Sequence, residues 1–503
     1  MTGRERVGAR RRGGRWIWIA LVALVLLVLV TAVQLVAGGQ VADDGDDECR
    51  YWVAPSPSGD DEASGTRERP WATLEHAAAA VPDDHCTVYF APGTYPGHNN
   101  PERRFRTETT FRSATPYQAV LEHAGTVLDI DGGRNITIEG FELRHAGPAA
   151  PRASYVAIVD RRAETWSEDI VFRNNIFHDS YGDDLLKIHN GVRSTTVEGN
   201  LFYNQGGNEQ SIDANSVTDI DIRDNIFFAD YAATGRSPDE PAKHFIIVKD
   251  SGVGDDGLEG TRNVVIRRNI FLNWDGGTEQ LVKIGNDGKP YYEARDVLVE
   301  NNLLIGNSAT VADAAFGVRG ARDVTFNNNT VVGDLPSRAF AYRIHLKDEN
   351  PRNENIRFTN NIWADPTGTM GSDGEGSENE FSNGDPDDVV DLVNDTNLYW
   401  NGGEPIPDGL ASPLTDDPHL IVADPRLPTD QSDIVLPLWH GDGFTSGTTA
   451  VRDEFIRLVE TYGALPTTSP AVDAADPETA ASEDILGRRR GVPDLGAVEA
   501  DGE

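Results

Sequence analysis

The sequence predicts an all-β protein, a single-stranded right-handed parallel β-helix with an N-terminal capping helix, preceded by one transmembrane helix. Two observations support this fold class. A strand phrase with a shared asparagine recurs along the middle of the chain, and an uncharged run follows an arginine-rich start. The length of 503 residues leaves room for a large core but does not select a fold. The repeat is the observation that predicts the architecture.

The recurring phrase is a β-branched alternation, then asparagine, then a second apolar pair. The asparagine stands at positions 175, 200, 225, 269, 302, 329 and 361, so successive phrases are 25, 25, 44, 33, 27 and 32 residues apart. Each phrase alternates apolar and polar residues, as a strand with one buried face does. We place the bend at the asparagine, which tolerates the left-handed backbone region. Such strands bury their inner face when successive coils stack. Hairpin signals are scarce and the spacing is too uneven for a propeller, so the parallel coil is preferred.

The first residues are predicted to lie outside the fold. A basic tail, 1–15, precedes an uncharged run, 16–37, which exceeds the roughly 20 residues that span a bilayer. An acidic linker, 38–48, follows it. This charge distribution places the N-terminus in the cytoplasm and the bulk of the chain outside it. A cleaved signal peptide is the alternative, although its apolar region is usually shorter. Both interpretations export the rest of the chain.

The formal net charge is −38. This value argues against a nucleic-acid partner, because binding phosphates requires the opposite sign. It suits an acidic surface that serves solubility or salt tolerance, and it also suits a surface that binds cations.

The chain contains two cysteines, Cys49 and Cys86. In an oxidising compartment, two cysteines in a short N-terminal region are expected to form a disulfide, which would tie the start of the fold to its first coil. Two unpaired thiols are the alternative. Neither a Cys-x-x-Cys pair nor a histidine-rich tract indicates zinc.

Five short segments near the two ends of the chain form a second pattern. They are YWVAPS (51–56), PWATLEHA (70–77), VYFAPGTY (88–95), SPAVDA (469–474) and PDLGAVE (493–499). Together they resemble the N-terminal cap and the terminal motif of pectate-lyase-like β-helix proteins. The resemblance implies a helix over 70–81 that covers the open end of the solenoid. It does not decide activity, since this fold carries lyases, hydrolases, epimerases and inert stalks.

Beyond the anchor, these features divide the chain into three parts. The β-helix with its cap is expected over 49–365. An acidic loop region, 366–415, follows; it is poor in apolar side chains and contains an exposed loop, 371–388. The last part, 416–503, is expected to fold back along the solenoid or to cap it, with a short helix over 451–462.

Charged side chains interrupt the repeat on the strands that precede the asparagine phrases. The side chains that alternation turns outward are Lys187 and His189 on one coil, Asp213 and Asn215 on the next, and, allowing for turns of different length, Lys249 and Lys283 on the two after that. Neighbouring coils are about 4.8 Å apart, so charges on adjacent coils interact. A slip of one residue would reverse this register.

This cluster predicts a calcium-assisted polysaccharide lyase that acts by β-elimination on a uronate-containing glycan. Removing the proton next to a uronate carboxylate requires a cation to stabilise the developing charge. It also requires a base, such as a lysine whose charged form is disfavoured. The candidate calcium ligands are Asp183, Asp184, Glu209 and Asp213; the candidate base is Lys249, with Lys187 or Lys283 as alternatives; the candidate substrate-binding residues are His189, His244 and Asn215.

The spacing is similar to that of calcium-dependent β-helix pectate lyases, which place acids on two successive coils and a lysine base downstream. Asp184 lies 25 residues before Glu209, and Lys249 lies 36 residues after Asp213. The match departs at Asn208 and Glu209, where the resemblance implies two aspartates, and no arginine clearly completes the site. These departures bear on metal affinity and on activity.

Other interpretations of the same residues stay open. Lysines and aspartates that alternate on a solvated face also arise from cross-strand pairing, which contributes about 0.2–1 kcal/mol per pair. For His178, His189 and His244, the role of a surface or hydrogen-bonded histidine is preferred to that of a ligand. A glycoside hydrolase requires two carboxylates at set separations, and Asp183–Asp184 is the one comparable pair. The alternative from another class is a non-catalytic surface solenoid that binds an acidic polysaccharide or cell-wall glycan, or that acts as a spacer.

Overall fold

The computed structural model describes residues 49–231, 241–252, 256–372, 379–409, 411–412, 416–428, 431 and 433–500. The predicted tail (1–15), anchor (16–37) and linker (38–48) therefore lie outside the described residues. Within the described ranges, no helix is both long enough and apolar enough to cross a membrane.

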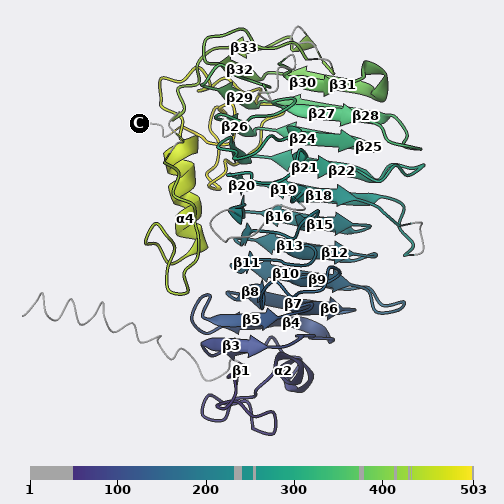
Figure 1. Cartoon of the computed structure of the whole chain (residues 1–503), viewed down its shortest axis with the longest axis vertical. Coiled ribbons are helices and arrows are strands. Elements are labelled where there is room, and N and C mark those ends of the chain that lie inside the picture. The colour runs from purple at the N-terminus through teal and green to yellow at the C-terminus, as the bar shows by residue number, and fades with distance from the viewer. Residues whose placement is uncertain are drawn as a thin grey trace, which may run out of the picture. The chain divides into compact units, whose positions relative to one another are not determined.

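Parallel strands from successive coils pair into three sheets (Figure 1). The first sheet contains β1 (Arg50–Val53), β2 (Thr87–Phe90), β4 (Arg104–Ser113), β7 (Arg134–Glu139), β10 (Glu168–Arg173), β13 (Arg193–Glu198), β16 (Thr218–Arg223), β19 (Thr261–Arg267), β22 (Ala294–Glu300), β25 (Ala321–Asn327), β28 (Asn353–Thr359) and β31 (Val389–Asp395). The second contains β3 (Gly93–Pro96), β5 (Ala119–His123), β8 (Glu142–His145), β11 (Ile176–His178), β14 (Leu201–Tyr203), β17 (Ile226–Phe228), β20 (Ile270–Phe271), β23 (Leu303–Ile305), β26 (Thr330–Val332), β29 (Ile362–Asp365), β32 (Leu398–Asn401) and β33 (Ile421–Val422). The third contains β6 (Leu128–Asp131), β9 (Ala157–Asp160), β12 (Leu186–His189), β15 (Gln210–Asn215), β18 (His244–Lys249), β21 (Gln280–Ile284), β24 (Ala314–Arg319), β27 (Tyr342–His345) and β30 (Ser382–Gly384). The predicted parallel β-helix is confirmed.

Stacked side chains of the same kind fill the inside of the coil. Phe177, Phe202, Phe227 and Phe271 occupy equivalent positions on four successive coils, and their ring centroids are 4.8, 5.0 and 5.1 Å apart. All four are fully buried. Each contributes on the order of 1.5–3 kcal/mol through burial of its side chain, so the repeat is held together along its whole length.

The shared asparagines form a continuous buried ladder between the first and second sheets. The Asn269 side-chain oxygen accepts hydrogen bonds from the backbone N–H (3.1 Å) and the amide Nδ2 (3.0 Å) of Asn225. Its own Nδ2 donates to the carbonyl of Ile222 at 2.9 Å and to the side-chain oxygen of Asn302 at 3.0 Å. The same pattern runs from Asn175 through Asn397. Each rung thus satisfies backbone groups that the bend between two strands leaves unpaired.

The prediction that these asparagines adopt the left-handed conformation is wrong by one residue. The positive φ angles fall on the preceding position, for example Asn174 (52°), Gly199 (66°) and Asp224 (57°). The bend requires a residue with a positive φ angle at this position, and the residue does not have to be asparagine or glycine, because Arg268 also has a positive φ angle there. The asparagine that follows is required for its amide group instead.

The N-terminal cap follows the expected order. Helix α2 (Leu74–Ala80) lies within the predicted 70–81, and the Thr73 side chain caps it by accepting from the N–H of His76. Ala77 and Ala78 are buried on the first coil. A disulfide joins Cys49, at the start of β1, to Cys86, at the start of β2.

The coil continues past residue 365, where the sequence predicts an acidic loop region. Strands β30, β31 and β32 lie between 382 and 401, together with the 3₁₀ helix η1 (Pro386–Asp388). Acidic residues of this region, such as Asp391, point away from the core while Leu398 and Tyr399 fill it. The low apolar content of this region therefore means that few of its residues face the core, and the strands themselves are present. Residues 373–378 of the predicted loop lie outside the described ranges.

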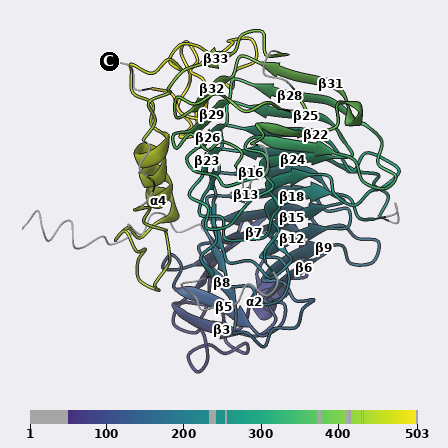
Figure 2. The same cartoon turned by 45° about the horizontal axis from the view of Figure 1, so that its top comes forward.

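The C-terminal segment from 433 to 500 covers the outer face of the second sheet (Figures 1 and 2). It contains helix α4 (Val451–Leu458), which a π-helical turn η3 (Val459–Gly463) extends across the predicted 451–462. Phe455 and Leu458 pack in one hydrophobic cluster with outward residues of the second sheet, including Ile176 and Leu201. This segment folds back along the solenoid, as expected, because that outer face is apolar.

The ladder gives a prediction about stability. Replacing Asn269 with alanine removes the acceptor of the Asn225 backbone N–H and of one of the two Asn225 amide N–H groups, and it removes a donor to the carbonyl of Ile222, so we expect a loss of about 3 kcal/mol. The thermal unfolding midpoint should fall clearly. The control is Asn263→Gly on the same coil, because Asn263 is exposed and glycine accepts its φ of 56°. Equal midpoints for the two variants would contradict the role of the ladder.

Candidate functional site

The outer face of the third sheet carries the charged side chains that the sequence singles out. Lys187 on β12 lies opposite Asp213 on β15, and Asp213 lies opposite Ile247, which lies opposite Lys283 on β21. Two residues further along the strands, His189, Asn215 and Lys249 occupy a second outward column. The predicted alternation and common face of these residues are therefore correct.

Three carboxylates gather where β12 and β15 begin. One oxygen from each of Asp183, Asp184 and Glu209 lies within 4.8 Å of the others. Asp184 is fully buried; one of its oxygens accepts from the N–H of Gln210 at 2.9 Å, and the other, Oδ2, has no hydrogen-bond donor. A buried carboxylate oxygen without a donor is costly. The position of these acids is thus one where a cation would be stabilised.

The protonation of the three acids reflects this crowding. Burial, followed by repulsion from Asp213 and Asp183, raises the pKa of Asp184 well above its usual value. Burial and the charge of Asp183 raise the pKa of Glu209 to about 7, and burial likewise raises the pKa of Asp183. All three shifts have the direction expected for carboxylates that lack enough positive charge nearby.

Asp213, the fourth predicted calcium ligand, is paired with lysines in this structure. The ammonium of Lys187 contacts Asp213 Oδ2 directly and lies 3.5 Å from Asp184 Oδ2. The ammonium of Lys249 lies 3.8 Å from Asp213 Oδ2 and 3.5 Å from Asp287. Lysine side chains are long enough to reach a carboxylate on the neighbouring coil. The position of Asp213 in the sequence does not show that two lysines reach it in this way. The carboxylates grouped for a cation are Asp183, Asp184 and Glu209.

The three lysines differ in their electrostatic surroundings. Burial disfavours the charged form of Lys187, but Asp213 and Asp184 outweigh it and raise the pKa of Lys187. Asp213 and Asp287 likewise outweigh burial at Lys249 and raise its pKa. Lys283 is the opposite case, because burial and the nearby Arg319 lower its pKa to about 8.

Two of the three predicted substrate-binding residues are held inside the protein. His244 is buried, its Nδ1 atom lies 2.6 Å from the carbonyl oxygen of Gln280, and burial lowers its pKa well below the usual value. Asn215 is buried and exchanges two hydrogen bonds with Ser251. Both side chains therefore hold neighbouring coils together. His189 stays partly exposed, near Asp160.

A cavity of about 370 Å³ opens beside the acidic cluster. Asp183 and Glu209 line it together with Arg152, Tyr181 and Asn208. No arginine was predicted at this site from the sequence, because Arg152 comes from the turn between β8 and β9, outside every repeat phrase. The cavity gives a ligand access to two carboxylates of the cluster and to a guanidinium group.

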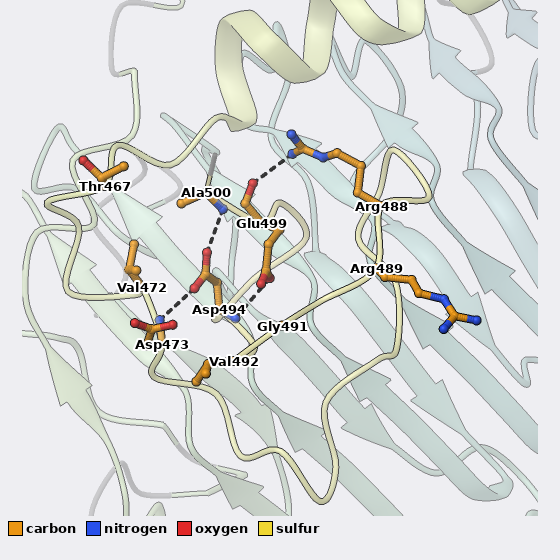
Figure 3. A pocket seen from close by; sticks show the side chains of 10 residues that line it. All are labelled: Thr467, Val472, Asp473, Arg488, Arg489, Gly491, Val492, Asp494, Glu499 and Ala500. Carbon is orange, nitrogen blue, oxygen red and sulfur yellow. Dashed lines mark hydrogen bonds between the residues drawn. The ribbon is translucent and has the colours of Figure 1, made fainter. Parts of the chain in front are cut away.

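A larger cavity, about 710 Å³, lies within the C-terminal segment (Figure 3). Its carboxylates already bind the chain: Asp494 accepts from the N–H groups of Asp473 and Ala500, both at 2.7 Å, and Glu499 accepts from the side chain of Arg490 at 2.8 Å. The terminal motif that carries the sequence resemblance therefore holds the C-terminal segment together through its own hydrogen bonds.

The acidic cluster fits a divalent cation such as calcium. Its donors are carboxylate oxygens, the ligands that hard cations prefer, and they include the buried Asp184 oxygen that has no donor. The residues that would hold the ion are Asp183, Asp184 and Glu209.

Comparisons with known proteins bear on the fold. No protein-family model matches the sequence, and no curated protein matches it. An exopolygalacturonase of Yersinia enterocolitica aligns with a TM-score of 0.50 and 12% identity over 71% of this chain and 72% of its own. Pectate lyase Pel9A aligns with a TM-score of 0.49 and 15% identity over 91% of this chain and 98% of its own. At these identities the likeness concerns the fold alone: the chain has the parallel β-helix fold of pectate-lyase-like proteins.

The raised carboxylate pKa values predict how cation binding depends on pH. Cations bind the deprotonated carboxylate, so calcium affinity should rise as the pH increases through about 7, where Glu209 loses its proton. Titration calorimetry at constant ionic strength measures this. Asp184→Asn should abolish binding. Asp131→Asn removes a carboxylate whose pKa is also raised to about 7, yet it lies outside the cluster and should leave binding intact. Affinity independent of pH would contradict the assignment.

Lys187 gives a second prediction, since its ammonium competes with a cation for Asp184. Lys187→Met keeps the length of the side chain and removes the charge, so calcium affinity should rise about tenfold or more. Lys289→Met removes an equal charge outside the cluster and is the control. Thermal unfolding in chelator shows whether each variant folds. Unchanged affinity in a folded Lys187→Met protein would show that Lys187 does not compete for the site.

Proposed function

We propose that this protein is a polysaccharide lyase that cleaves a uronate-containing glycan by β-elimination with the help of calcium. The observation that carries the proposal is the juxtaposition, on the outer face of one sheet, of three carboxylates that could hold a cation and a set of largely buried lysines. On the first sheet, by contrast, outward charges simply neutralise one another, as Arg112 does with Glu139 at 2.9 Å.

The proposed reaction needs a base and a charge that stabilises the substrate carboxylate. The base takes the proton from the carbon next to the carboxylate, the electron pair forms a carbon–carbon double bond, and the glycosidic oxygen leaves and takes up a proton. Calcium, when bound, supplies charge stabilisation for the carboxylate. Arg152 lines the adjacent cavity and is placed to orient an anionic sugar.

Lys249 is the proposed base because of its position. Its side chain is 15% exposed, against 4% for Lys283, and it lies on the coil after the acidic cluster. Its ion pairs with Asp213 and Asp287 keep it protonated, so it acts as a base only at alkaline pH. Lys283 is the second candidate, since its pKa of about 8 suits a base near neutral pH.

We further propose that residues 16–37 anchor the protein in the membrane with the β-helix outside the cytoplasm. The length of the uncharged run and the arginines before it support this. An exported position would bring the third sheet to extracellular or cell-wall glycans. Non-catalytic binding of such a glycan is the competing function.

Ultraviolet absorbance of the unsaturated product tests the function directly. The purified protein is mixed with polygalacturonate or alginate, in calcium or in chelator. We expect absorbance to rise in calcium alone, and Lys249→Ala to reduce the rate at least about a hundredfold while glycan binding persists. A flat trace from folded protein over the whole panel would favour the binding function.

The pH dependence of the rate separates the two candidate bases. If Lys249 is the base, the rate keeps rising well above pH 8, and Lys283→Ala retains activity. If Lys283 is the base, the rate levels off above about 8, the pKa of that lysine, and Lys283→Ala is the inactive variant. The second result would overturn the assignment of Lys249.

A further inference from the structure

A run of cations occupies the third sheet beyond the acidic cluster. In the outward column that contains Lys283, the next positions are Gly317 on β24 and Arg343 on β27. In the neighbouring column, Arg319 on β24 lies opposite His345 on β27. In the third sheet, β24 pairs with β21, and β27 pairs with β24 (Figure 1). The face that begins with carboxylates therefore continues with basic side chains.

Arg319 differs from the other arginine of this run. The Arg343 guanidinium contacts Asp313 and donates to the side-chain oxygen of Asn383. Arg319 forms no ion pair within the part of the chain that the structure describes, and its Nε–H is buried without an acceptor. A guanidinium that is partly desolvated and lacks an acceptor is costly to keep. An anionic group would supply the acceptor.

The surroundings of Arg319 carry a positive field. Burial and Arg319 together lower the pKa of Lys283 to about 8. Burial, Arg343 and Arg319 lower the pKa of His345 to about 4. Lys347, which is exposed, also acts on Lys283 in the same direction. Glu279 and Asp313 oppose these effects and do not cancel them. The field is positive here in a chain whose net charge is −38.

We propose that Arg319 is a second binding site, which holds a carboxylate of an anionic glycan. The inference rests on the proposed function, since it makes this site a remote contact for the same polymer. Asp213 on β15 and Arg319 on β24 are three coils apart, or about 14 Å. A glycan lying along the stack would therefore engage Arg319 several sugars away from the bond that is cleaved. Such contacts strengthen substrate binding without taking part in the chemistry.

Calorimetric binding of oligogalacturonate in chelator and low salt tests the site without turnover. Arg319→Gln should weaken binding about tenfold or more, because a charge-assisted hydrogen bond is lost. Arg319→Lys should restore part of the affinity. Arg357→Gln removes the same charge from an exposed position on β28 and should bind like the wild type. Fully methyl-esterified oligogalacturonate, which lacks the carboxylates, should bind weakly to all four proteins.

A second measurement separates failure of the site from failure of the proposed function. Thermal unfolding with and without sulfate probes the anion site alone, and sulfate should stabilise the wild type more than Arg319→Gln. If sulfate does so but no uronate glycan binds or is cleaved, the anion site stands and the proposed function falls. If Arg319→Gln binds oligogalacturonate and responds to sulfate as the wild type does, the anion site is refuted, whatever the lyase assay shows.

Discussion

Hydrogen bonding between successive coils holds equivalent residues about 4.8 Å apart, and the buried asparagine ladder is part of that bonding. Each amide closes the bend between two strands and joins it to the next coil, from Asn175 to Asn397. The ladder ends where Asp417 accepts from the N–H and Nδ2 of Asn397. Because each coil from Asn175 to Asn397 is tied at the same point, side chains at equivalent positions on these coils form straight columns.

These columns give the three outer faces different properties. On the first sheet, outward arginines form ion pairs with carboxylates of neighbouring coils, as Arg112 does with Glu139. On the second sheet, apolar residues such as Ile176 and Leu201 form a stripe that the C-terminal segment covers. On the third sheet the pairing is incomplete: Asp183, Asp184 and Glu209 gather on two early coils, whereas Arg319, on a later coil, has no carboxylate partner among the described residues. Charge that the chain leaves uncompensated is stabilised by ligands of the opposite sign, so this is the face where a ligand is expected to bind.

The sequence alone was sufficient for the fold and for the outward register of Lys187, Asp213 and Lys283, because alternation with a period of two survives turns of different length. The sequence was insufficient for the contacts of single side chains, which depend on their length and conformation and on the local turns. The distance that brings Lys187 to Asp213 depends on rotamers, and the burial of His244 and Asn215 depends on loops that vary from coil to coil. Arg152 belongs to no repeat phrase, so no pattern in the sequence indicated that it lies beside the acidic cluster. The amide role of the ladder asparagines was hidden because the left-handed residue stands just before them.

The strongly acidic composition argues against a polyanionic substrate only if the charge is spread evenly. At the acidic cluster, Lys187 and Lys249 already offset part of the negative charge, and a bound cation would offset more of it. At the far end, burial and Arg319 lower the pKa of Lys283, and burial, Arg343 and Arg319 lower the pKa of His345, as a positive local field does. Long-range repulsion is screened beyond about 10 Å at ordinary salt. An acidic glycan therefore responds to the field along the third sheet and much less to the net charge of the protein.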